Sequence, residues 1–254
     1  MKIEVIFLGT GTSQGVPVIG CSCDVCRSDD RRDGRLRSSV AIRVDGRVFV
    51  IDTSMDFRQQ ILREGITRLD GVIYTHEHRD HTGGLDDVRA FNYFQRRDMD
   101  LYCTERVEGE LRKMFHYAFA RSYPGVPRLR VNRIENRPFE IQGVRFVPVR
   151  GTHSSFEVFG FRLADFAYLT DFKTIDQCEL KKLEGVKVLV VNALRREEHL
   201  SHFNLDQALE LIKKINPEKA YLTHISHQMG LHAEVSRELG ANVALAYDGL
   251  KLEF

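Results

Sequence analysis

Short apolar runs, each closed by glycine or by polar residues, recur along the whole chain. Runs of about four to eight residues that are rich in β-branched and aromatic side chains are typical of strands. The pattern predicts strands at residues 2–8, 38–44, 48–51, 69–74, 100–104, 131–134, 139–141, 144–149, 159–163, 166–169, 186–191, 220–223, 243–245 and 250–254. Helices are predicted at residues 56–64, 85–94, 105–119, 175–183 and 204–214, with one more around His232.

The segment directly after the apolar run 69–74 reads Thr-His-Glu-His-Arg-Asp-His-Thr-Gly-Gly. Four side chains that can bind metal ions lie within six positions of it, at His76, His78, Asp80 and His81. Residues two apart do not face each other on a helix, but alternate side chains share a face in an extended segment. We therefore expect His76 and His78 to bind one ion from a loop, with Asp80 and His81 directed to a second ion. A histidine-rich solvated turn is the disfavoured alternative, because the strand-then-loop context of a metal motif is met.

Residues 9–17 form a glycine- and hydroxyl-rich loop after the first predicted strand. The backbone N–H groups of such a loop can bind phosphate. Neither the P-loop spacing nor a dinucleotide-binding motif is present, so a nucleotide-binding fold is only weakly indicated. Direct phosphate contact and a tight turn that lines the site are equally compatible with the sequence.

Three of the five cysteines cluster as Cys21, Cys23 and Cys26, while Cys103 and Cys178 stand alone. Three thiolates at this spacing suit tetrahedral zinc, whose fourth ligand must come from elsewhere in the chain. Incidental surface cysteines are the alternative. An odd number of cysteines without an export signal indicates a reducing compartment, and metal binding rather than disulfides.

The composition is that of a globular protein, with 43% hydrophobic and 29% charged residues in a length of 254 that fits one large domain. Lysine and arginine total 37 against 36 acidic residues, which argues against a strongly basic nucleic-acid surface but leaves a local basic site open. The first apolar run is too short for a signal peptide, and no run approaches a membrane span. We expect a cytoplasmic protein that does not contact a membrane.

The His-x-His-x-Asp-His pattern after a strand resembles the metallo-β-lactamase superfamily of hydrolases. The segment Leu8-Gly9-Thr10-Gly11 resembles one branch of it, the phosphodiesterase-like proteins. The Cys-x-Cys-x-x-Cys cluster narrows the resemblance to the phosphoribosyl 1,2-cyclic phosphate phosphodiesterases of bacterial phosphonate degradation. The resemblance implies an α/β fold, the four-layer αβ/βα sandwich. It also implies a single domain over residues 1–254, with a small zinc-binding insertion near 20–27, and suggests a homodimer.

The remaining metal ligands are implied by this resemblance. It assigns one catalytic metal to His76, His78 and His153, and the other to Asp80, His81 and His224, with Asp171 bridging the two. The expected cofactors are two divalent cations, which imidazole and carboxylate ligands allow to be zinc, manganese or iron, and one structural zinc. The family pattern gives the structural zinc to Cys21, Cys23, Cys26 and His227.

The resemblance also implies roles beyond metal binding. Asp80 is expected to orient the nucleophile, and His202, just before the helix 204–214, to act as general acid. Asp52, at the end of a predicted strand, is expected to hydrogen-bond near the ligands, with an N-cap of the helix at 56 as the alternative. His199 has no family counterpart and is expected to be exposed.

An aromatic-rich stretch covers residues 115–127 and contains His116. It is expected to be core packing followed by a surface loop, because exposed aromatic residues scattered singly are normal on protein surfaces. A lid that contacts substrate is the alternative. His116 is expected to be structural.

These features favour a dinuclear metal phosphodiesterase that hydrolyses a small cyclic or nucleotide-like phosphodiester. Two cations about 3.5–4 Å apart would activate a water and bind phosphate oxygens. A tRNA 3′-processing endonuclease is an alternative, although such enzymes carry a long arm for tRNA and no comparable stretch appears here. Lactam or thioester hydrolysis is another, which would need no general acid at His202. A non-catalytic metal-binding protein would bind metal without turnover.

Overall fold

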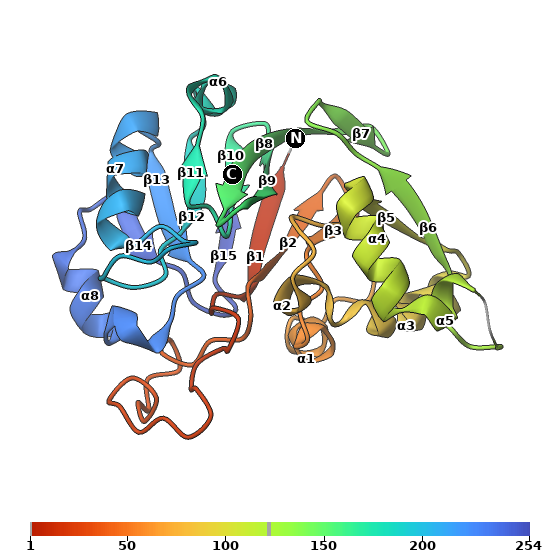
Figure 1. Ribbon diagram of the computed structural model, residues 1–254, viewed down its shortest axis with the longest axis horizontal. Helices are drawn as coiled ribbons and strands as arrows, with labels where there is room; N and C mark the ends of the chain where they lie inside the picture. The colour runs from red at the N-terminus through yellow and green to blue at the C-terminus, as the bar shows by residue number, and fades with distance from the viewer. Residues whose placement is uncertain (1, 121–122) are drawn as a thin grey trace. The chain divides into compact units, whose positions relative to one another are not determined.

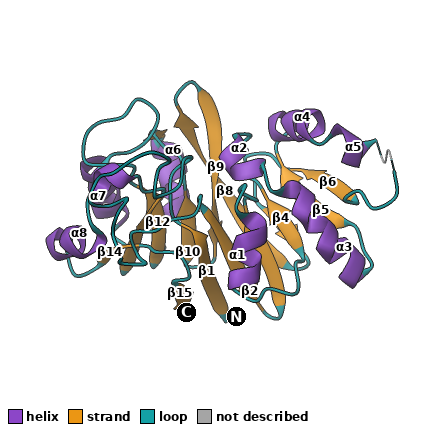
Figure 2. Cartoon of the chain, turned by 90° about the horizontal axis from the view of Figure 1, so that it is seen from below, coloured by secondary structure: helices purple, strands orange, loops and turns teal. Residues whose placement is uncertain are grey.

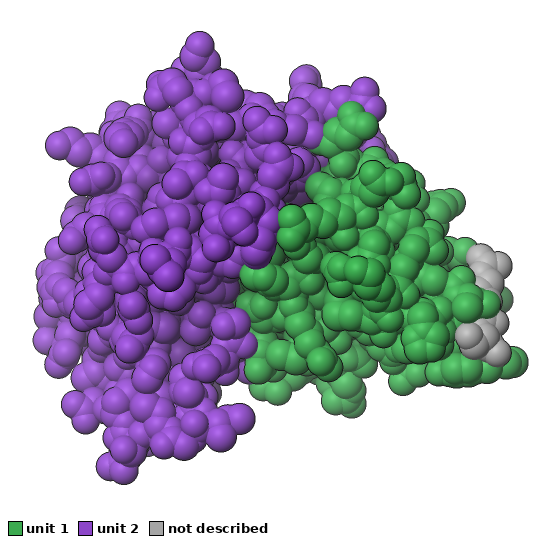
Figure 3. All heavy atoms as spheres, viewed as in Figure 1, with its two compact units in different colours: residues 1–9, 37–135, 249–254 green, residues 10–36, 136–248 purple. Residues whose placement is uncertain are grey.

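The computed structural model describes residues 2–120 and 123–254, and the chain divides into two compact units (Figure 3). Unit 1 comprises residues 1–9, 37–135 and 249–254, and unit 2 comprises residues 10–36 and 136–248. Each unit contains one β-sheet and its own helices (Figure 1). The single domain expected over residues 1–254 stays a prediction.

The sheet of unit 1 has seven strands in the order β15-β1-β2-β3-β4-β5-β6. The strands are β1 (Ile3–Gly9), β2 (Ser39–Val44), β3 (Arg47–Ile51), β4 (Gly71–Ile73), β5 (Met99–Cys103), β6 (Leu129–Arg133) and β15 (Lys251–Glu253). The pairs from β15 to β3 are antiparallel, and those from β3 to β6 are parallel. The hairpin between β2 and β3 turns at Asp45 and Gly46, whose φ angles of 46° and 77° are those that a two-residue hairpin turn requires.

The helices of unit 1 cover one face of this sheet (Figure 2). They are α1 (Phe57–Arg63), α2 (Arg79–Thr82), the 3-10 helix η1 (Leu85–Val88), α3 (Arg89–Gln95), α4 (Glu105–Met114) and α5 (His116–Phe119). Phe57, Phe91 and Leu111 pack from α1, α3 and α4 into one apolar cluster with the strand residues Leu8 and Val50. The helices therefore cover the apolar side chains on this face of the sheet, because the apolar face of an amphipathic helix is stabilised by burial against another element.

The sheet of unit 2 has the strand order β11-β8-β9-β10-β12-β13-β14, with β7 paired to β8. Its strands are β7 (Phe139–Ile141), β8 (Val144–His153), β9 (Phe156–Leu163), β10 (Phe166–Leu169), β11 (Thr174–Ile175), β12 (Val188–Asn192), β13 (Lys219–Thr223) and β14 (Val243–Leu245). The pairs β10–β12, β12–β13 and β13–β14 are parallel. The carboxyl ends of these strands therefore meet at one edge of the sheet.

Two longer helices, α7 (Leu205–Ile215) and α8 (His232–Glu238), pack on the sheet of unit 2. Leu211 and Val235 share a core with Leu189 and Val191 of β12. The helical segments of this unit are α6 (Gln177–Leu180), η2 (Lys181–Leu183), α7 (Leu205–Ile215), η3 (His227–Met229) and α8 (His232–Glu238). A capping box at Asn204 starts α7, which explains why the helix begins directly after the loop that contains His202.

Each predicted strand and helix has a counterpart in the structure, with its ends shifted by a few residues. Two details differ. The strand β11 was not expected, and Ile175 lies in it rather than in a helix. The helix expected at 105–119 is interrupted at Phe115, where φ is −115° and ψ is 36°. None of the described helices is long and apolar enough to cross a lipid bilayer.

The glycine-rich loop at residues 9–17 uses its backbone donors within the protein. Thr10 donates from both its backbone N–H and its hydroxyl to Oδ1 of Asp248, at 2.9 and 2.8 Å. The N–H of Gly11 donates to the carbonyl of Leu36 at 2.7 Å. Because these donors are already engaged, the structure favours the tight turn over direct phosphate contact.

A buried arginine joins this loop to the end of unit 2. Arg35 donates from its guanidinium to Oγ1 of Thr10, to the carbonyl of Ala246 and to Nδ1 of His232. Burial lowers the pKa of Arg35 to about 10. Burial, together with the charges of Arg35 and Arg32, lowers the pKa of His232 to about 4. Near neutral pH, His232 is therefore a neutral hydrogen-bond acceptor for Arg35.

We expect His232 to make the folded state sensitive to acid. Its pKa in the folded protein lies below the unfolded value of about 6.5, so the unfolded chain binds more protons and stability falls as the pH drops from about 6.5 toward 4. A His232→Asn variant, which keeps an acceptor near the position of Nδ1, should lose less stability over this window. Urea midpoints at about pH 7.5 and pH 5 measure this. His116→Asn, at an exposed histidine, is the control, and equal losses in wild type and His232→Asn would contradict the prediction.

Candidate metal centre

The predicted ligands of unit 1 follow the ends of two neighbouring parallel strands. Asp52 follows β3 directly, and the segment that begins at Thr75 follows β4, to which β3 is paired. Ligand sites in α/β sheets form outside the carboxyl ends of parallel strands, because the loops that follow them leave from the same edge. The topology therefore explains why Asp52 and the histidine motif are close together.

Asp52 is fully buried and accepts three hydrogen bonds. Thr75 donates to it from its backbone N–H at 2.9 Å and from its hydroxyl at 2.8 Å, and Nδ1 of His81 lies 2.7 Å from Oδ2. Burial raises the pKa of Asp52, and the His81 ring and the Thr75 donors oppose that rise. A proton held on Nδ1 by the carboxylate leaves Nε2 of His81 as the ligand atom. The alternative role, an N-cap, is wrong, because the N-cap of α1 is Asp56.

The motif itself is a loop that leads into one short helical turn. His78 has an extended backbone, with φ of −60° and ψ of 146°, and caps α2, which carries Asp80 and His81. Nε2 of His76 lies 3.1 Å from Nδ1 of His78, and Oδ2 of Asp80 lies 3.3 Å from Nε2 of His81. The structure thus brings together the two pairs that the spacing predicted. Imidazole nitrogens and a carboxylate at these separations are a donor set that fits divalent transition metals.

In unit 2, the predicted ligands again follow strand ends. His153 is the last residue of β8, Asp171 follows β10, and His224 follows β13 directly. Ligand atoms of His153, Asp171 and His202 all lie within 4.8 Å of one another. Nδ1 of His224 lies 3.2 Å from Oδ2 of Asp171. The structure therefore gathers three histidines around the buried carboxylate of Asp171.

Two residues that the sequence analysis did not single out hold this half of the centre in place. The Ser201 carbonyl lies 2.8 Å from Nδ1 of His153, so a proton on Nδ1 leaves Nε2 available to a metal. The Asn192 side chain accepts from the N–H of Phe172 at 2.8 Å and donates to its carbonyl at 3.0 Å. This clamp fixes the backbone directly after Asp171.

Three site residues adopt a left-handed backbone, although none is glycine. The φ angles are 66° for Asp52, 63° for Asp171 and 54° for His224. Such conformations cost about 1–3 kcal/mol each and persist where the surroundings over-determine them, often at functional sites. All three directly follow, or lie two residues after, a strand end, so the turn aims each side chain across the edge of its sheet.

His202 is buried against Asp171, with Nδ1 at 3.5 Å from Oδ1. Burial lowers the pKa of His202 to about 2, and the charge of Asp171 opposes that lowering. The expectation that His199 is exposed is wrong, because its side chain is half-buried. Its ring centroid lies 5.2 Å from that of His202. The short spacing of His199 and His202 in one loop is the feature of the sequence that could have indicated that the two rings lie together.

The cysteine cluster is assembled within unit 2. Ligand atoms of Cys21, Cys23, Cys26 and His227 lie within 4.8 Å of one another, and the sulfurs of Cys21 and Cys23 are each 3.3 Å from Nδ1 of His227. Hydrogen bonds from the backbone of Cys26 and from His227 lower the pKa of Cys23 to about 6. A lowered pKa favours the thiolate, which is the metal-binding form. Three sulfurs and one imidazole form a donor set that fits structural zinc.

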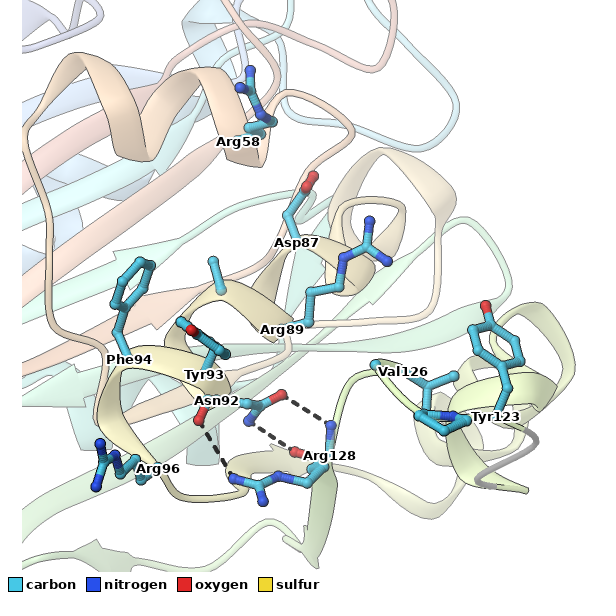
Figure 4. Close-up of a pocket in the computed structure, with 13 residues that line it drawn as sticks. Arg58, Asp87, Arg89, Asn92, Tyr93, Phe94, Arg96, Tyr123, Val126 and Arg128 are labelled. Atoms are coloured by element: carbon cyan, nitrogen blue, oxygen red, sulfur yellow. Dashed lines mark hydrogen bonds between the residues drawn. The ribbon is translucent and has the colours of Figure 1, made fainter.

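A cavity of about 910 Å³ lies in unit 1 (Figure 4). Four arginines line it together with aromatic side chains, and none of the lining residues is a predicted ligand. The stretch 115–127 contributes both to the core and to this cavity, because Phe115 is buried while Tyr123 is 53% exposed and lines the hollow. Residues 121 and 122 of that stretch lie outside the described residues. His116 is exposed rather than structural.

Residues 47–225 match the family model described as Beta-lactamase superfamily domain. Because the match spans more than half of the chain, the chain belongs to this superfamily, and its α/β metallo-β-lactamase fold, with two sheets flanked by helices, is confirmed. Members of the superfamily are mostly metal-dependent hydrolases.

Among solved structures, a new diphosphatase from the PhnP family is 41% identical, with a TM-score of 0.95 over 100% of this chain and 98% of that chain. Zinc-bound PqqB from Methylobacterium extorquens is 20% identical, with a TM-score of 0.78 over 99% of this chain and 100% of that chain, and shares the fold. An octanoyltransferase of Porphyromonas gingivalis is 41% identical over 253 residues. That alignment covers 98% of this chain but 51% of the relative, so the chain spans about half the length of this curated relative.

We expect Asp52→Asn to weaken metal binding at the histidine motif. An amide cannot accept from both Thr75 donors and also hold the proton of His81 on Nδ1. Loss of such a supporting hydrogen bond typically lowers metal affinity about 10- to 100-fold. Competition with a chromophoric chelator measures the affinity, and Asp45→Asn, at an exposed turn, is the control. An unchanged affinity in Asp52→Asn would remove this role.

We expect Cys23→Ser to lose one equivalent of zinc per chain, because a hydroxyl is a much poorer zinc ligand than a thiolate. Elemental analysis after dialysis gives the stoichiometry. Cys178→Ser, at an exposed cysteine outside the cluster, should keep the wild-type content. Full zinc content in Cys23→Ser would show that the cluster does not bind this ion.

Proposed function

We propose that the protein is a metal-dependent phosphoric diester hydrolase, acting on a small cyclic or nucleotide-like phosphodiester. The observation that carries the proposal is the set of ligand-type side chains aimed by strand ends in both units, with His202 beside Asp171 in one of them. The likeness over its full length to a diphosphatase of the PhnP family supports phosphorus chemistry.

The proposed catalytic metals would be held by His76, His78, Asp80, His81, His153, Asp171 and His224, and a structural zinc by the cysteine cluster. The nitrogen and carboxylate donors are compatible with zinc, manganese or iron. When bound, such cations supply a water of lowered pKa and neutralise the charge of phosphate oxygens. A homodimer and a reducing, cytoplasmic location rest on the resemblance and on the cysteine content alone, and they too are proposals.

The chain's own residues would do the remaining work. The carboxylate of Asp80 orients the attacking water toward phosphorus. His202 donates a proton to the leaving oxygen as the bond between that oxygen and phosphorus breaks. An anionic phosphate beside His202 favours the protonated ring and so opposes the effect of burial on its pKa. Ser201 and Asp52 keep His153 and His81 in the orientation that binding requires.

Other activities have weaker support. The octanoyltransferase name belongs to a relative of which the chain covers 51%, so it assigns no chemistry to the matched half. A tRNA 3′-processing endonuclease and a lactam or thioester hydrolase could use the same ligand set. His202, buried beside Asp171, favours chemistry in which a leaving oxygen needs a proton. A non-catalytic metal-binding protein would give metal content without turnover.

Protein loaded with manganese or zinc should hydrolyse bis(p-nitrophenyl) phosphate, and treatment with a chelator should abolish the turnover. The release of p-nitrophenolate measures the rate. Protein that retains its full metal content but gives no turnover would move the assignment to ester or thioester substrates, or to binding alone.

The variant His202→Ala tests the general acid. We expect kcat to fall about 10²- to 10⁴-fold for a phosphodiester with an alkoxide leaving group, because that oxygen must be protonated as it leaves. The loss should be much smaller for p-nitrophenolate, which is a stable anion. His116→Ala is the matched control. Full turnover of the alkoxide substrate by His202→Ala with both metals bound would remove the assignment.

A further inference from the structure

We propose that His199, with Arg195 and Lys173, forms a subsite for a second phosphoryl group beside His202. The substrate class would then be a diphosphate diester, in which two phosphorus atoms share a bridging oxygen. This inference rests on the proposed phosphorus hydrolase. Beyond that function, the class of phosphate compound that the site selects and the residues that select it are specified.

The orientation of His199 is set by Ser201. The Ser201 N–H lies 3.3 Å and its hydroxyl 3.2 Å from Nδ1 of His199. A backbone N–H can only donate, so Nδ1 accepts and the neutral ring carries its proton on Nε2. Since the Ser201 carbonyl also faces Nδ1 of His153, one residue orients a predicted metal ligand and the adjacent donor together.

The position of His199 places that donor beside the reacting group. The ring centroids of His199 and His202 are 5.2 Å apart, and those of His202 and His153 are 4.6 Å apart. The three rings therefore form a continuous row. Leu200, between them in sequence, is 90% exposed, so the loop turns its apolar side chain outward while both histidines stay at the site. A phosphoryl group held at His202 has its bridging neighbour next to His199.

Burial lowers the pKa of His199, and the nearby charges of Arg195 and Lys173 lower it further. In the part of the chain that the structure describes, neither cation forms an ion pair with a carboxylate. Arg195 donates to the amide oxygen of Gln228 at 2.9 Å and to the carbonyl of Glu198 at 3.0 Å. Lys173 donates to the amide oxygen of Gln207 at 3.1 Å. Within the described residues, both cations are thus bonded to neutral oxygens. The Nε atom of Arg195 is buried and has no hydrogen-bond partner among the residues that the structure describes.

The same side chains explain how a diphosphate would react. Water adds to one phosphorus, and the bond from that phosphorus to the bridging oxygen breaks. The electron pair stays on the bridging oxygen, which leaves as part of a phosphate monoester. His199, Arg195 and Lys173 stabilise the charge that develops on this leaving phosphate, where preorganised donors contribute most. The products are two phosphate monoesters. One keeps the oxygen and one proton of the water, while His202 gives a proton to the bridging oxygen of the other and is reprotonated by the second proton of the water.

The experiment compares two substrates in the metal-loaded protein, ADP-ribose as a diphosphate diester and bis(p-nitrophenyl) phosphate with one phosphorus. His199→Ala should lower kcat/KM for ADP-ribose about tenfold or more, as expected for a lost hydrogen bond to a charged group, and should lower kcat/KM for bis(p-nitrophenyl) phosphate far less. His199→Gln, whose Nε2 can still donate, should recover part of the loss. Arg195→Met should act in the same direction as His199→Ala, and His116→Ala is the matched control.

A binding measurement separates this inference from the proposed hydrolysis. Calorimetric titration of the metal-loaded protein with the α,β-methylene analogue of ADP-ribose, whose bridge cannot be hydrolysed, should show weaker binding to His199→Ala than to wild type. Equal affinity, or equal losses on both substrates, would overturn the subsite. If wild type hydrolyses neither compound but its binding of the analogue still depends on His199, the proposed function fails while the subsite stands.

Discussion

The buried carboxylate of Asp52 is the constraint on which the histidine motif depends. Asp52 follows β3 and has a left-handed backbone conformation. Its carboxylate accepts hydrogen bonds from the backbone N–H and the hydroxyl of Thr75, and it holds the proton of His81 on Nδ1. A buried charge of this kind is tolerated only when its hydrogen bonds are complete. The hydrogen bonds from Thr75 and His81 therefore offset the strain of the turn and the free-energy cost of burying the carboxylate. These bonds form only when the motif loop has its observed conformation.

Much of the fold could be predicted from local patterns. Strand positions follow from short β-branched runs, and the metal-binding pairs follow from the alternation of side chains in an extended loop. What the pattern missed depends on distant partners. The position of His199 depends on how the loop after β12 folds back on His202, and β11 exists only because β8 lies beside it. From the sequence, the N–H groups of the glycine-rich loop could equally have bound phosphate. In the structure, Asp248 accepts hydrogen bonds from both donors of Thr10.

The cysteine cluster illustrates the same division between local and distant information. The spacing of Cys21, Cys23 and Cys26 indicates zinc by itself, because three thiols so close in sequence have few other uses in a reducing compartment. The fourth ligand lies 206 positions from Cys21, and no local pattern could select it. His227 is implied by the family resemblance instead. Its position beside the sulfurs now rests on the loop that follows β13.

The pairing of β15 with β1 bears on how the chain is made. Unit 1 draws its edge strand from residues 251–253, whereas β1, which that strand borders, is translated before every other element of both units. On the ribosome, β1 must therefore wait with one edge uncovered until translation has passed every other element of both units. Exposed strand edges promote pairing between chains. Nascent polypeptides of this protein would accordingly be vulnerable to pairing through β1 until residues 251–253 have been translated, and slow translation of that segment would prolong the interval.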